Sequence, residues 1–342
     1  MTEEKARIGV IGSGTWGTAI AVLLNRNGHE VTLWSAIPEE IRTLRETGMH
    51  PNLPGVTLPG QLQLTADLEE AMRGKDLLVL SVPSIFTRQT AARMKPFCPK
   101  GQIIVNVAKG IEDETLMTLS EIVKQEIPQA DVCVLSGPSH AEEVSRGIPT
   151  SVVVGADSRS SAEYIQQLFM SPVFRVYTSP DVLGIELGGS LKNVIALAAG
   201  IADGLGYGDN TKAALITRGI HEITRLGTAM GGRAETFAGL SGIGDLIVTC
   251  ASMHSRNRRA GILMGQGRSM KEAMDEVHMV VEGVYSAKAA RHLAQKYHVA
   301  MPIVDQVNQV LFEEKDARDG VRDLMMRDAT GETGLSWPEE EN

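Results

Sequence analysis

One stretch of the chain decides its fold: Ile8–Trp34, which reads IGVIGSGTWGTAIAVLLNRNGHEVTLW. An apolar run typical of a β-strand, Ile8–Ile11, leads into the glycine pattern G-x-G-x-x-G at Gly12–Gly17. A helical pattern then covers Ala19–Leu24, and a second strand-like run covers Glu30–Trp34. The order strand, glycine pattern, helix and strand predicts a dinucleotide-binding unit, whereas the glycine pattern alone is weak evidence.

Each glycine of this pattern has a separate predicted role. Gly12 permits a tight turn, Gly14 lets the backbone approach a pyrophosphate group, and Gly17 allows the helix to pack closely on the strand. The N-terminus of the helix presents free N–H groups and the positive end of a dipole to the anion. A purely structural glycine-rich turn is the alternative, and the strands on either side favour the nucleotide site over it.

The alternation continues through the first half of the chain, where apolar runs typical of strands are separated by helical patterns. The further runs are Leu77–Leu80, Gln102–Val107, Val132–Leu135, Thr150–Val154 and Phe174–Tyr177. This pattern is typical of a mostly parallel sheet wrapped by helices. Beyond Asp181 the patterns become long and helical, as in Leu191–Leu205 and Ala213–Met230.

We therefore predict an α/β protein with an N-terminal Rossmann-type, doubly wound, mostly parallel sheet and a C-terminal all-helical domain. The sheet domain is assigned to residues 1–185, and the helical substrate domain to residues 186–328. The last segment, 329–342, is acidic and contains Gly331, Gly334 and Pro338, which predicts a flexible tail.

The composition, 43% hydrophobic and 22% charged residues, is typical of soluble globular proteins. The N-terminus lacks the pattern of a signal peptide, and we find no apolar run of about 18 residues that would span a membrane. Cys98, Cys133 and Cys250 lie far apart, which favours free thiols in a reducing compartment over a disulfide framework. The net charge of −9 opposes general nucleic-acid binding. We predict a cytoplasmic protein.

The end of the second strand normally decides which cofactor is bound. An acidic residue there binds the ribose 2′-hydroxyl of NAD, and an arginine accommodates the 2′-phosphate of NADP. Here Trp34 is followed by Ser35 and Ala36, which offer neither group. Glu39 and Glu40 come too late to be assigned as ribose ligands and are suited to begin a helix after a proline. The choice between NAD and NADP stays open.

Three polar segments follow predicted strands: Ser81–Ser84, Ala108–Gly110 and Ser136–Ser139. In an open α/β sheet the ligand crevice lies at the carboxyl ends of the strands, so these segments should line it. Lys109 comes directly after an apolar strand. It is either a cation that faces the ligand or a lysine of a solvated loop.

A second lysine stands out in the predicted helical domain. Lys192 lies at the start of an apolar helix, directly before the segment Val194–Ala199. Burial lowers the pKa of a lysine toward the range that suits proton transfer. Reduction of a carbonyl requires a proton donor, and Lys192 can fill that role. The alternative is a lysine that extends its ammonium group to water.

Two further segments, Ser241–Asp245 and Ser255–Arg259, complete the candidate site. Arginine beside Ser and Asn donors suits recognition of a phosphate group, although a solvated helix face would also explain the cluster. Asp245 could orient the Lys192 ammonium group or bind a substrate hydroxyl. The eight histidines form no metal-ligand spacing, and no G-x-S-x-G pattern occurs, so metal and serine-hydrolase chemistry are not indicated.

Taken in order from Ile8 to Asp328, these motifs resemble bacterial NAD(P)-dependent glycerol-3-phosphate dehydrogenase. Further matching segments are Ser136–Ala141, Leu187–Val194, Ala214–Gly219, Gly242–Leu246 and Val281–Gly283. The resemblance implies hydride transfer from NADH or NADPH to C2 of dihydroxyacetone phosphate, which yields sn-glycerol 3-phosphate for phospholipid synthesis. It also implies Lys192 as the catalytic proton donor and a homodimer. The family often has Arg or His where this chain has Ser35 or Ala36, which weakens any inference of NADP preference.

The resemblance also implies individual binding residues. Those that match the family's substrate site are Lys109, Gly137, Ser139, Lys192, Asp245, Ser255, Arg256 and Asn257. Those that match its cofactor contacts, besides the three glycines, are Thr15, Trp16, Lys109, Ala141, Arg256, Val280 and Glu282.

Two other functions fit parts of the sequence. A hydroxyacid dehydrogenase of the 6-phosphogluconate type would share a Rossmann domain and a helical domain with a lysine, but the segments Gly242–Asp245 and Ser255–Arg259 argue against it. A non-enzymatic regulator that senses NAD(P)H would bind cofactor without turnover. The set Lys109, Lys192 and Asp245 is more than such a sensor needs.

Overall fold

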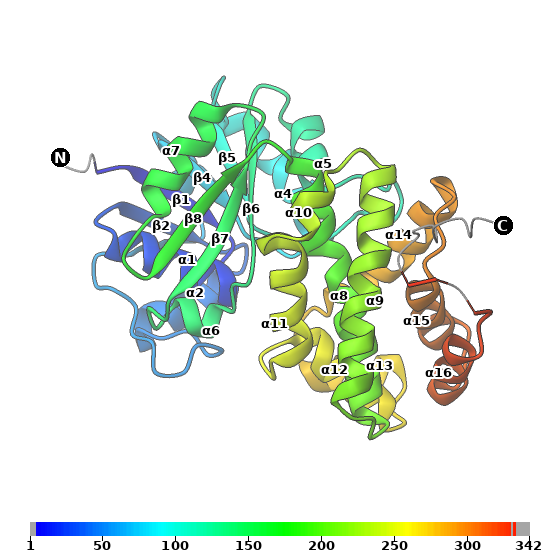
Figure 1. The fold of residues 1–342 in the computed structure, drawn as a ribbon. Coiled ribbons are helices and arrows are strands. Elements are labelled where there is room, and N and C mark those ends of the chain that lie inside the picture. The colour runs from blue at the N-terminus through cyan, green and yellow to red at the C-terminus, as the bar shows by residue number, and fades with distance from the viewer. Residues whose placement is uncertain (1–4, 330, 333–342) are drawn as a thin grey trace.

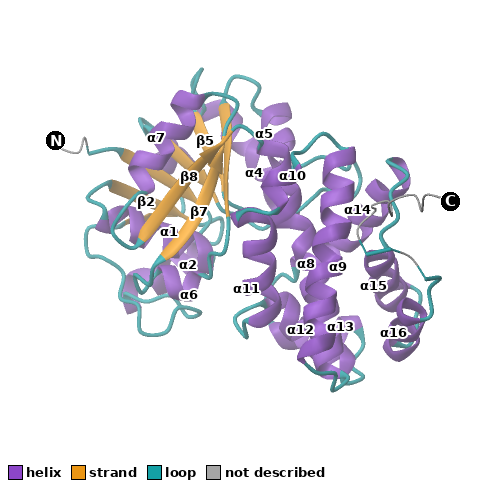
Figure 2. Ribbon diagram, viewed as in Figure 1, coloured by secondary structure: helices purple, strands orange, loops and turns teal. Residues whose placement is uncertain are grey.

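The computed structural model describes residues 5–329 and 331–332 (Figure 1). Residues 1–4, at the N-terminus for which we predict no signal peptide, lie outside the described residues. Most of the predicted tail 329–342 lies outside them as well. Within the described part, the chain forms a sheet flanked by helices and, beside it, a bundle of helices (Figure 2).

Eight strands form one sheet in the order β3-β2-β1-β4-β5-β6-β7-β8. All neighbours are parallel except β6 and β7. The mostly parallel α/β fold predicted from the sequence is therefore confirmed. The strands are β1 (Arg7–Ile11), β2 (Glu30–Trp34), β3 (Gln63–Thr65), β4 (Leu77–Leu80), β5 (Ile103–Asn106), β6 (Asp131–Ser136), β7 (Thr150–Gly155) and β8 (Phe174–Ser179).

Alternate residues of the central strands face different helices, as the two-residue period of a strand requires. In β4, Val79 packs on the side that holds Ile20 of α1, whereas Leu78 packs on the side that holds Met94 of α4. Both faces are covered, which explains why these strands are continuously apolar. The helices of this domain are α1 (Thr15–Arg26), α2 (Pro38–Thr47), α3 (Leu68–Met72), α4 (Thr87–Met94), α5 (Leu119–Glu126), α6 (Ala141–Val144) and α7 (Arg159–Phe169).

The helical domain is built around α8 (Val182–Gly204), whose residues are almost all buried. Asp181 begins this helix by accepting a hydrogen bond from the Gly184 N–H at 2.9 Å. The other elements are α9 (Asp209–Ala229), α10 (Ala234–Phe237), the π-turn Leu240–Gly244, α11 (Asp245–Ala251), α12 (Arg256–Gly265), α13 (Met270–Val277), α14 (Glu282–Lys296), α15 (Pro302–Phe312) and α16 (Ala317–Met325).

The length and mean hydropathy of α8 are sufficient for a helix that spans a membrane. We found no apolar run of this length in the sequence. Of its most apolar window, 89% is buried inside the protein, as in the core helix of a water-soluble fold. The bent helix pair Ala234–Ala251 and Arg256–Gly265 passes the same test.

A glycine seam joins α8 to α12. A Cβ atom on Gly200 would lie 2.2 Å from the Arg258 carbonyl oxygen, and one on Gly204 would lie 2.2 Å from that of Ile262. The two backbones are therefore in direct contact, and no larger residue fits. The seam fixes α12 along α8, and a hydrogen bond of 2.9 Å from Asn257 Nδ2 to Asn193 Oδ1 joins the start of α12 to the middle of α8.

The reversal of strand direction at β7 determines where α8 passes the sheet. Ser179, the last residue of β8, pairs with Gly155 of β7, which in turn pairs with Val134 in the middle of β6. The chain then turns back, and α8 runs toward the carboxyl end of β6. There a Cβ atom on Gly189 would lie 2.8 Å from the Ser136 hydroxyl oxygen.

Lys192 lies further along its helix than the sequence predicts. The sequence placed this lysine at the start of an apolar helix, but α8 begins at Val182. Lys192 therefore lies about 15 Å along the helix, beyond the strand ends, and its side chain is 7% exposed. Asp181 marks the start of α8 in the sequence, because it is an N-cap residue whose side chain accepts a hydrogen bond from the first helical turn.

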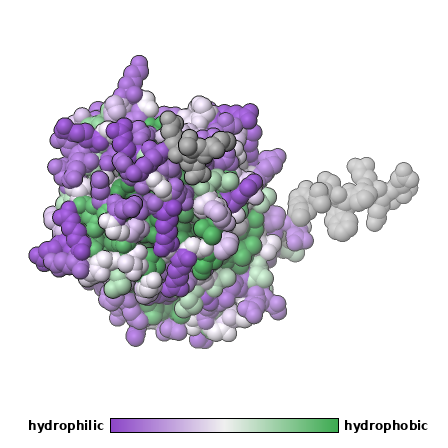
Figure 3. All heavy atoms as spheres, turned by 90° about the vertical axis from the view of Figure 1, so that its left-hand side faces the viewer, coloured by the Kyte–Doolittle hydropathy of each residue, from purple (hydrophilic) through white to green (hydrophobic). Residues whose placement is uncertain are grey.

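Figure 3 shows the face of the molecule on the side of the sheet domain. Hydrophilic side chains predominate around its edge, and hydrophobic ones gather in a band across the middle. Exposed large apolar residues of the sheet domain include Ile37, Met49, Ile148 and Tyr177.

Candidate active site

A cavity of about 460 Å³ lies between the carboxyl ends of the parallel strands and the helical domain. This volume falls in the usual range for small-molecule sites. The predicted site residues that line it are Gly14, Thr15, Trp16, Lys109, Ser139, Ala141, Lys192, Ser255, Arg256, Asn257, Val280 and Glu282. Gly12, Gly17, Gly137 and Asp245 are not part of this lining.

The glycine loop has the geometry that a pyrophosphate group requires. Gly12 has a φ of 121°, and a Cβ there would lie 2.8 Å from the backbone of Ser81. A Cβ on Gly17 would lie 1.9 Å from the Gly12 carbonyl oxygen, so only glycine lets α1 pack this close. A Cβ on Gly14 would meet no atom within 4 Å, and no side chain caps the N-terminus of α1 beside it. The helix end is thus open to an anion.

Unpaired polar atoms also mark the cavity as a ligand site. Among the residues that the structure describes, three buried side-chain atoms at the cavity have no hydrogen-bond partner: Thr15 Oγ1, Ser81 Oγ and His140 Nε2. Buried polar groups are normally paired, so these atoms fit a bound polar molecule. Together with the open helix end, they show that the residues present suit a dinucleotide.

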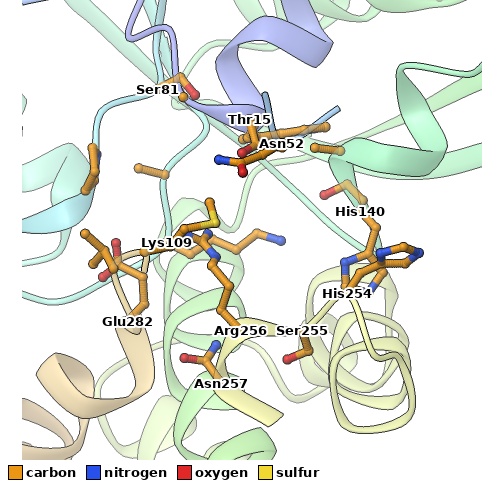
Figure 4. A pocket seen from close by; sticks show the side chains of 18 of the residues that line it. Thr15, Asn52, Ser81, Lys109, His140, His254, Ser255, Arg256, Asn257 and Glu282 are labelled. Carbon is orange, nitrogen blue, oxygen red and sulfur yellow. The ribbon is translucent and has the colours of Figure 1, made fainter. Parts of the chain in front are cut away.

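Figure 4 shows how the labelled side chains are distributed around the cavity. Thr15, Asn52 and Ser81 lie at one end, whereas Ser255, Arg256 and Asn257 lie at the other, with Lys109 between them. Thr15 of the nucleotide loop and Arg256 thus lie on opposite sides of Lys109.

Three charged side chains from different elements meet at the centre of the site. Asp245 Oδ2 lies 2.6 Å from Lys109 Nζ, and Asp245 Oδ1 lies 2.6 Å from Lys192 Nζ. Lys192 Nζ also donates to Thr249 Oγ1 at 2.6 Å, and Lys109 Nζ donates to the Gly137 carbonyl oxygen at 3.1 Å. Asp245 is the first residue of α11, directly after the π-turn, and a carboxylate at a helix N-terminus is favoured by the helix dipole.

Burial and neighbouring charges shift the proton affinities of this cluster. Burial, together with the positive charge of Lys109, lowers the pKa of Lys192 to about 8, although Asp245 acts in the opposite direction. Burial raises the pKa of Asp245, but the two ammonium groups outweigh it and hold that pKa below its ordinary value. Asp245 is therefore ionised at neutral pH, and Lys192 can exchange a proton readily.

Arg256 extends from the first turn of α12 into the cavity. Its guanidinium group makes no hydrogen bond or ion pair with the residues described, and burial lowers its pKa. Because an arginine stays charged even when buried, this group is suited to bind an anion that enters the cavity. Arg258, by contrast, pairs with Asp203 at 2.8 Å and is held away from the site.

Several predicted residues hold the site together. Asn257 Nδ2 donates to Asn193 Oδ1 at 2.9 Å, and its Oδ1 accepts from the Gly283 N–H at 2.8 Å. Glu282, at the start of α14, accepts a hydrogen bond from the Ser84 N–H at 3.1 Å, which joins the helical domain to the loop after β4. Ser139 Oγ donates to the Gly137 carbonyl oxygen at 2.9 Å.

Other residues also line the cavity. Arg259, which was predicted only as part of the segment Ser255–Arg259, lies three positions after Arg256, so the helical spacing could have placed both on one face. The remaining residues were missed. His50 and Asn52 come from the long loop between α2 and β3, which has no periodic pattern to mark them. Glu40, which the sequence interpretation assigned only to the start of a helix, lines the cavity as well. Among the residues described, no His, Cys, Asp or Glu cluster could hold a metal ion.

Comparison with known proteins identifies the family. Residues 7–162 match the family model for the N-terminus of NAD-dependent glycerol-3-phosphate dehydrogenase, and residues 181–322 match that for its C-terminus. The glycerol-3-phosphate dehydrogenase [NAD(P)+] of Agathobacter rectalis is 62% identical over 97% of this chain and 99% of its own. That of Fusobacterium nucleatum is 58% identical over 94% of this chain and 97% of its own.

A solved structure agrees with this assignment. The glycerol-3-phosphate dehydrogenase of Coxiella burnetii superimposes with a TM-score of 0.91 at 37% identity, over 94% of this chain and 99% of that one. Sequence and fold both match along nearly the whole length. The chain therefore belongs to the NAD-dependent glycerol-3-phosphate dehydrogenase family.

Proposed function

We propose that this protein interconverts dihydroxyacetone phosphate and sn-glycerol 3-phosphate. The observation that carries the proposal is the ion-paired cluster Lys109, Asp245 and Lys192, whose two lysines line the same cavity as the open nucleotide loop and the unpaired Arg256. When bound, a nicotinamide cofactor supplies the hydride for C2 of the ketone, or accepts it in the reverse direction.

Lys192 is the proton donor to the C2 oxygen in this proposal. With a pKa of about 8, it is protonated at neutral pH and releases its proton at little cost as charge develops on that oxygen. Asp245 holds the Lys192 ammonium group in place and stays ionised. Lys109, on the other carboxylate oxygen, adds a positive charge that stabilises the developing alkoxide.

Arg256 is the proposed ligand of the substrate phosphate. It has five N–H donors, and among the residues described it has no acceptor for them. A phosphate group would supply both the acceptors and the compensating negative charge. The exposed Arg259, one helical turn further on, also lines the cavity and adds to the positive potential there.

Further parts of the proposal rest on the family resemblance. We place the protein in the cytoplasm, where its product would enter phospholipid synthesis, and all three cysteines are free thiols, as a reducing compartment requires. We propose a homodimer, which the hydrophobic band in Figure 3 would suit. We keep the division into domains 1–185 and 186–328, with α8 as the element that crosses it.

The test of this function follows nicotinamide absorbance while the purified protein is mixed with dihydroxyacetone phosphate and NADH or NADPH. We expect turnover that requires both the ketone and the cofactor. Cofactor binding without turnover would instead favour a sensor of NAD(P)H. Turnover with a hydroxyacid substrate only would favour the 6-phosphogluconate type of dehydrogenase.

Replacing Arg256 by methionine should raise KM for dihydroxyacetone phosphate by about 10- to 100-fold, because a hydrogen bond to a charged group contributes about 1.5–3 kcal/mol. The effect on kcat should be smaller, since the proton donor is unchanged. Initial rates at varied substrate concentration measure both quantities.

Unphosphorylated dihydroxyacetone provides the control for this variant. Because it lacks the phosphate group, its kcat/KM should be the same in the variant and the wild type. An equal loss with both substrates would show that Arg256 acts on something other than the phosphate.

A further inference from the structure

The cavity end beyond the glycine loop contains a carboxylate with unusual partners. Glu40 lies in the first turn of α2 and folds back over the end of β2. Its Oε2 accepts hydrogen bonds from Ser13 Oγ at 2.7 Å and from Ser35 Oγ at 2.6 Å. Ser13 belongs to the glycine loop, and Ser35 directly follows the last residue of β2. The carboxylate is therefore held at the junction of these two segments.

This junction is where the adenosine ribose is bound in proteins with this type of sheet. In most of them the acidic residue comes directly from the end of the second strand. Here Ser35 occupies that position, and the carboxylate arrives from the following helix instead. The two serine hydroxyls fix it there, which compensates for its greater distance along the chain.

One oxygen of this carboxylate is available to a ligand. Both hydrogen bonds go to Oε2, and among the residues described Oε1 has no hydrogen-bond partner. Glu40 is exposed and lines the cavity together with Ser13 and Gly14. A carboxylate oxygen can accept a hydrogen bond from a ribose hydroxyl but repels a phosphate group.

No cation in the described part of the chain offsets this charge from within the cavity end. Arg42 pairs with Glu39 and with Glu46 on the outer side of α2. The Arg93 guanidinium group lies over the Trp34 ring, 5.4 Å from its centroid, and does not line the cavity. His50 contacts the Ser13 carbonyl oxygen at 3.1 Å, and burial lowers its pKa, so it is neutral at pH 7.

We propose that Glu40, oriented by Ser13 and Ser35, selects NAD(H) over NADP(H) by binding the 2′-hydroxyl of the adenosine ribose and repelling a 2′-phosphate. The inference rests on the proposed function, because it concerns the cofactor of that same site. It assigns a cofactor preference that the spacing of the sequence left open.

The test compares equilibrium binding of NADH and NADPH to the full-length protein, measured by the fluorescence of the reduced nicotinamide. Wild-type protein should bind NADH about tenfold or more tightly than NADPH, because the 2′-phosphate would lie within a few ångströms of a carboxylate. In Glu40→Gln, which keeps the size and removes the charge, the affinity for NADPH should rise by about tenfold. The affinity for NADH should change by less than about threefold.

Glu39→Gln is the matched control. Glu39 is the neighbouring residue on the same helix, pairs with Arg42 and does not line the cavity, so its variant removes one charge without touching the serines. The ratio of the two affinities should be unchanged in this variant. If both variants shift the ratio equally, the effect is one of net charge and the proposal is wrong.

Two further outcomes separate this inference from the proposed function. Equal or tighter binding of NADPH by the wild type, with turnover intact, would overturn the role of Glu40 alone. Binding of neither cofactor by the folded wild type would overturn the proposed function and, with it, this inference. Thermal unfolding of each variant establishes that the protein is folded in every measurement.

Discussion

Replacing Lys192 by methionine should lower kcat for dihydroxyacetone phosphate reduction by about 10³, while NADH binding changes by less than about twofold. A positioned proton donor typically contributes 10²- to 10⁴-fold, and methionine fills a similar volume without an exchangeable proton. Lys192 lies in the middle of α8, whereas the glycine loop precedes α1 in the sheet domain, so the substitution leaves the contacts of that loop with the cofactor in place. Single-turnover rates and NADH fluorescence measure the two effects separately.

The pH dependence of the wild type gives this prediction a second readout. Reduction requires protonated Lys192, so its rate should fall as pH rises through about 8, the pKa of this group. Oxidation of glycerol 3-phosphate requires the neutral amine, so its rate should fall as pH drops through the same value. Both transitions should be absent in the residual activity of Lys192→Met.

Lys271→Met provides the control, because Lys271 is an exposed lysine of α13 that does not line the cavity. We expect its kcat and pH profile to match those of the wild type. If Lys192→Met retained full turnover with an unchanged pH profile, another group would have to be the proton donor.

Replacing Asp245 by asparagine should destabilise the protein by about 3–5 kcal/mol and lower turnover by at least about 10². The carboxylate compensates the buried ammonium group of Lys192 and the half-buried one of Lys109, each 2.6 Å away, and the amide removes that charge while keeping the shape. Removal of one partner of a buried ion pair is costly because the remaining charge stays desolvated. Urea unfolding and steady-state kinetics measure the two effects.

A double variant distinguishes charge from shape. Adding Lys192→Met to Asp245→Asn should restore part of the lost stability, because one of the uncompensated ammonium groups is removed. Asp319→Asn is the control, since Asp319 forms an exposed ion pair with Arg322, and such pairs contribute little. Unchanged stability in Asp245→Asn would mean that the lysines lose their charge in the fold.

The elements predicted from the sequence are those whose pattern is local. The run Leu77–Leu80 is continuously apolar because both faces of this strand are buried. The glycine loop requires glycine because of contacts within the loop itself and with the backbone after the neighbouring strand. Strand β3 was not predicted, because Gln63–Thr65 is too short to show a period. The start of α8 was misplaced because Gly184, Gly188 and Gly189 weaken its helical pattern.

The candidate site was less accessible to such reasoning, because its contacts cross the chain. Glu282 binds Ser84 from the other domain, and no periodicity connects these two positions. Glu282 had been inferred as a site residue only through the family resemblance, whereas Ser84 belongs to a polar segment that was predicted from its place after a strand. Glu40 was not assigned as a ribose ligand, because it lies too far along the chain from the end of the second strand. The fold nevertheless brings its carboxylate to Ser35 at that strand end. Sequence distance and spatial distance differ where a helix turns back over a strand.

The course of α8 has a consequence for how this chain can vary in length. The length of the helix from Val182 to Lys192 sets the position of the lysine beyond the strand ends. Asp181 fixes the start of this segment. Each residue inserted or deleted there would shift Lys192 by about 1.5 Å and rotate it by about 100°, which turns it away from the cavity. Related chains can therefore gain or lose residues in the loops on either side, but not within these three turns.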